Sequence, residues 1–297
     1  MRISRARLLF QVTAVAAALT VAACGSDKPS PGTGTFSADA VATDPGPIHV
    51  HGLGINPSDG ALFVATHTGL FRSAPGEKRS RRVGGRFQDT MGFTVIGPDR
   101  FLGSGHPDLR DKLPPFLGLI RSGDAGRSWD PVSLLGDADF HVLEAQGQHV
   151  YGAGSDFGTR AEQLLVSDDG GKQWDERTLP GSLLALAIRP GNPGEVVASG
   201  EAQLYASPDG GSKWRPVAGE PGLLAWPAQD RLFALGFDGT LRRSADAGRS
   251  WEAAGSLGGE PAAFEAAAPG ELYAALHDGT IKRSGDGGKT WSVRARP

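Results

Sequence analysis

"SGDGGKTW" (284–291) is the last of a series of near-identical stretches that recur along this sequence. Serine and aspartate two residues apart, followed by glycine, are typical of a tight turn. Their oxygens accept hydrogen bonds from nearby backbone N–H groups, and glycine adopts a positive φ without strain. The tryptophan then supplies a large apolar ring at the start of the next segment. Four further copies stand upstream, at "SGDAGRSW" (122–129), "SDDGGKQW" (167–174), "SPDGGSKW" (207–214) and "SADAGRSW" (244–251).

The spacing of these copies predicts the fold. They begin 45, 40, 37 and 40 residues apart, and a degenerate sixth copy is visible at "FRSAPGEK" (71–78). The last repeat holds four strand-like segments, at 262–268, 271–277, 279–284 and 290–296. Four short strands in about 40 residues are the pattern of a propeller blade. We therefore predict an all-β fold, a six-bladed β-propeller of four-stranded antiparallel blades over residues 48–297.

Closure of the predicted ring is left open by the sequence. The chain ends within the outer strand of the last blade, so no strand is left over to exchange with the first. Packing between blades, or a strand contributed by residues before Ile48, are the two alternatives.

The repeated motif resembles the Asp box, also called the BNR repeat. The chain is similar to Asp-box β-propeller lipoproteins that are often labelled glycosyl hydrolases, and to bacterial sialidases. In such a motif the aspartate locks its own turn and the tryptophan packs between neighbouring sheets. We therefore expect a structural and not a catalytic role for the five box aspartates, Asp124, Asp169, Asp209, Asp246 and Asp286.

The first part of the chain predicts export and anchoring. In residues 1–24 three arginines precede an apolar stretch that is too short and interrupted for a membrane span, as in a secretory signal peptide. This segment ends in "VAACG" (21–25), which resembles a bacterial lipobox with Cys24 as the acylated residue. Residues 25–47, rich in Ser, Pro and Gly, predict a flexible tether. The chain is thus expected on the extracytoplasmic face of a bacterial cell membrane, held by lipid.

Composition excludes some classes of function. Cys24 is the only cysteine, so the predicted propeller has no disulfide and no thiolate nucleophile or ligand. The formal charge of −3 becomes −6 once the three arginines of the signal peptide are removed. Without a basic face, nucleic acid is not an expected partner.

Aligning the predicted blades gathers polar side chains at one mouth of the central channel. "HVHGLGINP" (49–57) aligns with "DTMGFTVIGP" (89–98) and "DFHVLEAQG" (139–147), at the start of the innermost strand. In blades 4 and 5 the corresponding residues are Leu184 and Ala225. Three more histidines, His67, His106 and His277, lie in turns between the second and third strands, on the same face. The set comprises His49, His51, Asp89, Met91, Asp139 and His141, with His67 and His106 on the rim.

Imidazole, thioether and carboxylate groups converging at a channel mouth suit a transition metal. A mixture of histidine and methionine favours copper, especially Cu(I), whereas histidine and aspartate alone suit zinc as well. The alternative is an ordinary polar mouth whose histidines bond carbonyls or water. A small polar ligand, a glycan or a protein partner is also compatible with it.

Enzymatic activity is the competing hypothesis. Similarity to sialidases implies a glycoside hydrolase acting on extracellular glycans, which needs an arginine cluster, a tyrosine nucleophile and an aspartate acid. This chain lacks Arg-Ile-Pro ahead of the first box, and Tyr151 and Tyr273 align with core positions. No pair of carboxylates stands out. The sequence favours a membrane-tethered binding module without catalytic activity.

Overall fold

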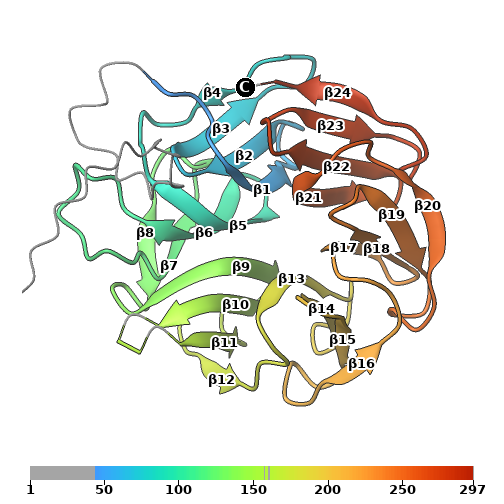
Figure 1. The fold of residues 1–297 in the computed structure, drawn as a ribbon. Helices are drawn as coiled ribbons and strands as arrows, with labels where there is room; N and C mark the ends of the chain where they lie inside the picture. The colour runs from blue at the N-terminus through green and yellow to red at the C-terminus, as the bar shows by residue number, and fades with distance from the viewer. Residues whose placement is uncertain (1–43, 157, 160, 297) are drawn as a thin grey trace, which may run out of the picture. The chain divides into compact units, whose positions relative to one another are not determined.

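The computed structural model describes residues 44–156, 158–159 and 161–296. Within them the chain forms 24 strands in six four-stranded antiparallel sheets. The sheets follow one another around a ring, with the first strand of each innermost (Figure 1). The predicted six-bladed β-propeller is confirmed.

Each blade takes its four strands from one repeat. Blade 1 holds β1 (Val50–Ile55), β2 (Leu62–Thr66), β3 (Gly69–Ser73) and β4 (Arg81–Arg82), and blade 2 holds β5 (Asp89–Gly97), β6 (Arg100–His106), β7 (Leu119–Ser122) and β8 (Asp130–Ser133). Blade 3 holds β9 (Ala138–Gln146), β10 (His149–Asp156), β11 (Glu162–Ser167) and β12 (Asp175–Arg177), and blade 4 holds β13 (Leu183–Ile188), β14 (Val196–Gly200), β15 (Leu204–Ser207) and β16 (Arg215–Val217). Blade 5 holds β17 (Leu223–Ala228), β18 (Arg231–Leu235), β19 (Thr240–Ser244) and β20 (Glu252–Ser256), and blade 6 holds β21 (Pro261–Ala268), β22 (Glu271–Leu276), β23 (Ile281–Ser284) and β24 (Ser292–Ala295).

The hydrophobic core lies between the blades. Strand β2, "LFVAT", is buried along its whole length, and its side chains alternate between two neighbours. Leu62 and Val64 join a cluster with residues of blade 6, while Phe63 and Ala65 join a cluster with residues of blade 2. Each of the other interfaces has a cluster of the same kind. Burial on both faces explains why second strands read as continuous apolar runs.

The repeated turns share one hydrogen-bond pattern. In the last of them the Ser284 hydroxyl donates to the Asp286 carboxylate (2.8 Å) and accepts from the Gly288 N–H (2.8 Å). The same carboxylate accepts from the Thr290 N–H (3.0 Å) and hydroxyl (2.7 Å), which lower the pKa of Asp286 to about 2. Gly288 has φ of 92°, which glycine tolerates best. Equivalent contacts recur around Asp124, Asp169, Asp209 and Asp246.

Five of the six interfaces contain the tryptophan that follows the repeated turn. Each ring packs with the cluster shared with the preceding blade, and these tryptophans are Trp129, Trp174, Trp214, Trp251 and Trp291. The first repeat lost its tryptophan, so the interface between blades 6 and 1 is built differently. There the Arg294 guanidinium donates to the carbonyls of Ala74 (2.8 Å) and Glu77 (2.6 Å) in the degenerate turn.

Ring closure uses no exchanged strand in the described residues. Blades 1 and 6 each complete four strands from their own repeat. Residues before the first strand, from 44 on, add none. A single parallel bridge joins Arg79 to Arg296. In the part of the chain that the structure describes, the blades close the ring by packing, and a strand from residues 1–43 stays untested.

Predictions for residues 1–43, including the acylated Cys24, the signal peptide and most of the tether, lie outside the described residues. In the described part of the chain, no helix is long and apolar enough to cross a membrane.

Candidate functional site

A β-bulge on the innermost strand positions three of the predicted residues. The pairing of β1 with β2 skips His51, that of β5 with β6 skips Met91, and that of β9 with β10 skips His141. A bulge leaves one residue outside the ladder and redirects its side chain. All three residues line a central cavity of about 90 Å³. The bulges thus bring these side chains to one channel mouth.

Blade 4 shares this bulge but places an apolar residue at it, and blade 5 lacks the bulge. The register of blade 4 skips Leu184, which lines the same cavity at the predicted position. Blade 5 has no bulge there, because its irregularity lies at the other end of β17, after Ala225. Ala225 pairs with Phe233 as Gly54 pairs with Phe63, several residues further along the strand than His51. The predicted equivalence of Ala225 with His51 is therefore wrong.

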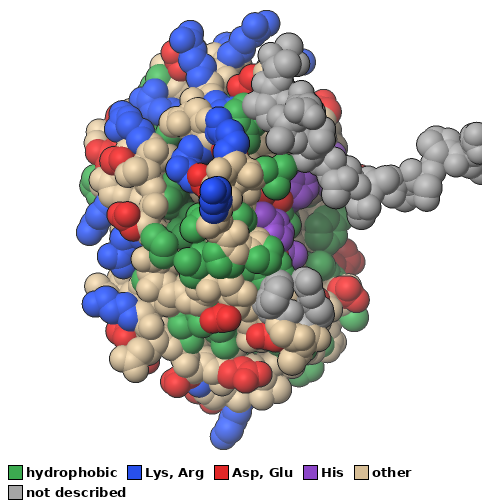
Figure 2. Space-filling model, turned by 90° about the vertical axis from the view of Figure 1, so that its left-hand side faces the viewer, with side chains coloured by type: hydrophobic (Ala, Val, Ile, Leu, Met, Phe, Trp, Pro, Cys, Tyr) green, Lys and Arg blue, Asp and Glu red, His purple; other side chains and the backbone are tan. Residues whose placement is uncertain are grey.

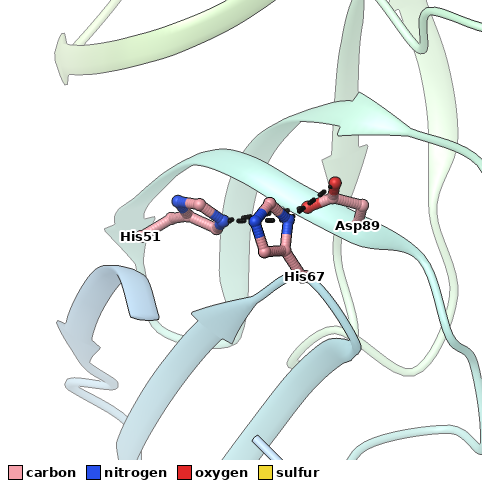
Figure 3. A group of neighbouring side chains, drawn as sticks. All are labelled: His51, His67 and Asp89. Atoms are coloured by element: carbon pink, nitrogen blue, oxygen red, sulfur yellow. Dashed lines mark hydrogen bonds and ion pairs between the residues drawn. The ribbon is translucent and has the colours of Figure 1, made fainter. Parts of the chain in front are cut away.

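His51, His67 and Asp89 form the centre of the site (Figure 3). Their ligand atoms all lie within 4.8 Å of one another. His67 Nδ1 is 2.9 Å from Asp89 Oδ2 and 3.2 Å from His51 Nε2, and His51 Nε2 is 3.9 Å from Asp89 Oδ1. His51 and Asp89 come from the inner strands of adjacent blades, and His67 from the turn after β2. We call these three residues the first His–Asp set.

One proton cannot satisfy all the contacts of the first His–Asp set. A histidine nitrogen carries either one hydrogen or one lone pair. If His67 Nδ1 donates its hydrogen to Asp89, His51 Nε2 can accept only a weaker, bifurcated bond from that same hydrogen. If it is unprotonated, its lone pair faces the carboxylate. A cation between the three ligand atoms would satisfy all of them at once.

The buried groups of the first His–Asp set carry little positive charge of their own. Burial, reinforced by the neighbouring histidines, lowers the pKa of His51 to about 3, so this imidazole is neutral at ordinary pH. Burial also raises the pKa of Asp89, against the opposing effect of its bond to His67. Asp89 Oδ1 is buried and has no hydrogen-bond partner. An unpaired buried carboxylate oxygen is costly, and metal binding is one way to relieve that cost.

His106, Asp139 and His141 lie beside the first set, in blades 2 and 3. His141 Nε2 is 3.0 Å and His106 Nε2 is 3.4 Å from Asp139 Oδ2. The bond to Asp139 raises the pKa of His141. His49 is exposed, in a left-handed backbone conformation (φ 49°), with its ring 5.1 Å from that of His67. All eight predicted residues are thus placed around the first three blades, where histidine side chains gather near one edge of Figure 2.

Two carboxyls that the sequence analysis did not pair lie deeper in the same cavity. Glu144 of β9 and Glu265 of β21 both line it. Glu144 pairs with Tyr151 and Glu265 with Tyr273, so they hold equivalent positions in blades 3 and 6, on opposite sides of the ring. Burial raises the pKa of Glu265 to about 7 and, with the charge of Glu265, raises that of Glu144. The signal for Glu265 was a glutamate in the otherwise apolar strand β21, whereas the strand of Glu144 also carries Asp139 and His141.

Other ionisable residues lie away from the mouth or are engaged elsewhere. His149 contacts Asp168 (2.5 Å) and His277 contacts Glu260 (3.7 Å). A cavity of about 210 Å³ lies between blades 5 and 6, lined by Arg231, Arg243 and other residues, with no histidine. This larger cavity is not the candidate site, because the histidines that could hold a metal ion are at the channel mouth.

The parts of a sialidase site are engaged in structural roles. Tyr151 and Tyr273 are buried, with hydroxyls that donate to the Pro193 carbonyl (2.7 Å) and the Glu271 carboxylate (2.6 Å). Arg283, which precedes the last repeated turn, also pairs with Glu271 (2.8 Å). These groups stabilise blades and do not converge on the channel mouth.

Comparison with known proteins adds information on the fold. No family model and no curated protein matches this chain. It is similar to YCF48 from Cyanidioschyzon merolae, at 16% identity and a TM-score of 0.51 over 84% of this chain and 86% of that one. It is also similar to an ancestral GH74 enzyme, at 14% identity and 0.54 over 81% of this chain. The match spans 37% of that enzyme's chain.

A third similar structure is YCF48 bound to D1 peptide, at 18% identity and a TM-score of 0.39, over 69% of this chain and 82% of that one. At such identities the likeness extends to the fold alone, and the class of protein defined is a β-propeller.

Proposed function

We propose that this chain is a lipid-anchored, extracytoplasmic Asp-box β-propeller that binds a transition-metal ion at its channel mouth. The ligands are His51, His67 and Asp89. The observation that supports this most is their convergence within 4.8 Å, with one buried carboxylate oxygen left unpaired. Neutral imidazoles and a carboxylate are the donors that such ions take.

Copper is favoured over zinc because of Met91. Its side chain lines the same cavity as His51 and His141. A thioether is a soft ligand that selects Cu(I), whereas it adds little for zinc. The first His–Asp set alone would accept either ion.

Cavity size favours an ion over a sugar. Glu144 and Glu265 have raised pKa values, as one carboxyl of a glycosidase pair does. Their cavity of about 90 Å³ is well below the roughly 300–1,000 Å³ of ligand pockets. Glycoside hydrolysis is therefore the weaker proposal, even though a glycoside hydrolase shares the fold.

Metal content tests the proposal. The full chain, in a Cys24→Ser background that removes the competing thiol, is loaded with Cu(I) or Zn(II), desalted and analysed for bound metal. His67→Ala should lose one equivalent relative to the parent protein, and His149→Ala, outside the site, should lose none. Binding should weaken at acid pH, where protons compete with the metal for the imidazole nitrogens and for Asp89, whose pKa is raised by burial. Equal metal content in His67→Ala and the parent would contradict the proposal and favour a glycan or protein ligand.

Anchoring has a separate test. With its cysteine present, the chain should fractionate with membranes after export, whereas Cys24→Ser should be released or remain as uncleaved precursor. A mature Cys24→Ser protein that still fractionates with membranes would contradict lipid attachment.

A further inference from the structure

The residues beside the first His–Asp set repeat its design one blade further on. In the first set, His67 in the turn after β2 contacts Asp89 on the inner strand of the next blade, at 2.9 Å. In the same way His106, where β6 ends, contacts Asp139 on the inner strand of blade 3, at 3.4 Å. Each set then adds the bulged histidine of an inner strand, but from a different blade: His51 lies in the blade of His67, whereas His141 lies in the blade of Asp139. We call His106, Asp139 and His141 the second His–Asp set.

The hydrogen bonding of His106 fixes where its lone pair points. His106 Nδ1 lies 2.9 Å from the carbonyl oxygen of Pro115. A carbonyl only accepts, so Nδ1 carries the hydrogen and donates it. In the neutral ring Nε2 then bears a lone pair, and that lone pair faces Asp139 Oδ2. A lone pair directed at a carboxylate oxygen is unfavourable, and either a proton on Nε2 or a metal cation between the two groups relieves the repulsion.

The Pro115 carbonyl is what a metal-binding histidine normally has on its other nitrogen. Ligating histidines commonly donate their second N–H to a backbone carbonyl, which fixes the tautomer and the ring. This carbonyl comes from the longest insertion of the propeller, residues 106–116, which starts at His106 itself and folds back onto it. The insertion thus orients the imidazole towards Asp139.

Asp139 provides an independent observation that fits a cation site. Its side chain is 5% exposed, and Oδ1 is buried without a hydrogen-bond partner. Asp89 has the same orphaned oxygen in the first set. Asp139, which is buried, and Asp89, which is half-buried, therefore each have one buried oxygen without a hydrogen-bond partner.

We propose that the second His–Asp set binds a second transition-metal ion, so that the channel mouth holds two ions side by side. Its ligands are His106 Nε2, Asp139 and His141 Nε2. The two imidazoles are 40% and 51% exposed, so an ion can reach them from solvent. This site goes beyond the proposed function, which needs only the first set.

Stoichiometry distinguishes the two sites. Zn(II), and in parallel Cu(I), is titrated into the full chain in the Cys24→Ser background against a chromophoric chelator. Single variants His67→Ala and His106→Ala remove one ligand from each set. His277→Ala, an exposed histidine that contacts Glu260 in blade 6, is the matched control. Circular dichroism of each variant establishes that it is folded.

The parent protein and His277→Ala should bind two ions, and His67→Ala and His106→Ala one each. One ion in the parent, retained by His106→Ala and lost by His67→Ala, would overturn the second site and leave the proposed function standing. One ion lost by both variants would mean a single shared site and also overturn it. No binding to the parent would overturn both proposals.

Discussion

At the scale of single residues, protonation explains most of the behaviour expected of the site. Burial and the neighbouring histidines lower the pKa of His51 to about 3, so its imidazole is neutral and does not repel a metal cation. Asp89 and Asp139 each keep one unpaired, buried oxygen. The cluster therefore holds more lone pairs that face one another than hydrogens to place between them. A bound cation would relieve this repulsion.

Met91 decides between copper and zinc. Met91→Leu preserves the volume and removes the soft donor. We expect Cu(I) affinity to fall by about tenfold or more while Zn(II) affinity changes little, measured by competition with chelators of known affinity. Leu241→Met, in the core between blades 5 and 6, is a control that adds a thioether outside this cavity. An equal change for both ions would contradict a role for the thioether in selectivity.

Ser207 represents the repeated turns. Its buried hydroxyl accepts from the N–H groups of Asp209 (3.3 Å) and Gly211 (2.9 Å). Ser207→Ala leaves a buried N–H unsatisfied, which should cost about 1–3 kcal/mol in the free energy of unfolding. Ser212→Ala, exposed in the same turn, is the control and should change little. Denaturant unfolding measures both, and equal stabilities would contradict the structural role of this turn.

At the scale of elements, the repeat motif predicts the strands and blades, whereas the sequence does not predict which inner strands carry a bulge. The spacing of the turns predicts the blades because each turn joins the third and fourth strands of one sheet. Alignment of the inner strands also places His51, Met91 and His141 together, because blades 1 to 3 share a bulge. It fails for Ala225, because blade 5 has its irregularity elsewhere. Which inner strand bulges depends on packing against its neighbours, which no local pattern records.

Contacts between distant segments were also beyond the sequence. The insertion at 106–116 is visible as extra length, but its use of the Pro115 carbonyl to orient His106 depends on how the loop folds back. Glu144 and Glu265 read as isolated carboxylates until the ring places blades 3 and 6 opposite each other. Both cases involve geometry set by the closed ring.

The interface between blades 6 and 1, which closes that ring, contains Arg294 of β24 in place of a tryptophan. The Arg294 guanidinium donates to Ser73 Oγ (3.1 Å) and to the Ala74 and Glu77 carbonyls of blade 1. Arg294→Ala should lower the free energy of unfolding by about 1.5–3 kcal/mol, the range for hydrogen bonds from charged donors. Arg215→Ala, an exposed arginine on β16, should cost much less. Thermal or denaturant unfolding compares them, and equal effects would mean that Arg294 does not hold the closure.

At the scale of the whole molecule, the channel couples stability to pH. Burial raises the folded-state pKa of Glu265 to about 7, above the ordinary value of 4.5. Between these values the folded protein binds more protons than the unfolded chain, so stability falls as pH rises from about 4.5 to about 7. The raised pKa of Glu144 acts in the same direction.

Glu265→Gln should remove this dependence. The variant should match the parent near pH 4 and exceed it at pH 8 by up to about 3 kcal/mol, from 1.36 kcal/mol for each pKa unit. Glu176→Gln, exposed on β12, should leave the pH profile unchanged. Denaturant unfolding across pH 4–8 tests this. A parallel profile for Glu265→Gln and the parent would show that the channel carboxyl is not strained by its charge.

The most direct test of the metal-binding account is anomalous X-ray diffraction from crystals of the protein loaded with copper, recorded on both sides of the copper absorption edge. The account predicts an anomalous peak within bonding distance of imidazole nitrogens of both His51 and His67, with Asp89 completing the site. Refined density that shows these three residues bonded only to each other or to water, in crystals whose copper lies elsewhere, would contradict it.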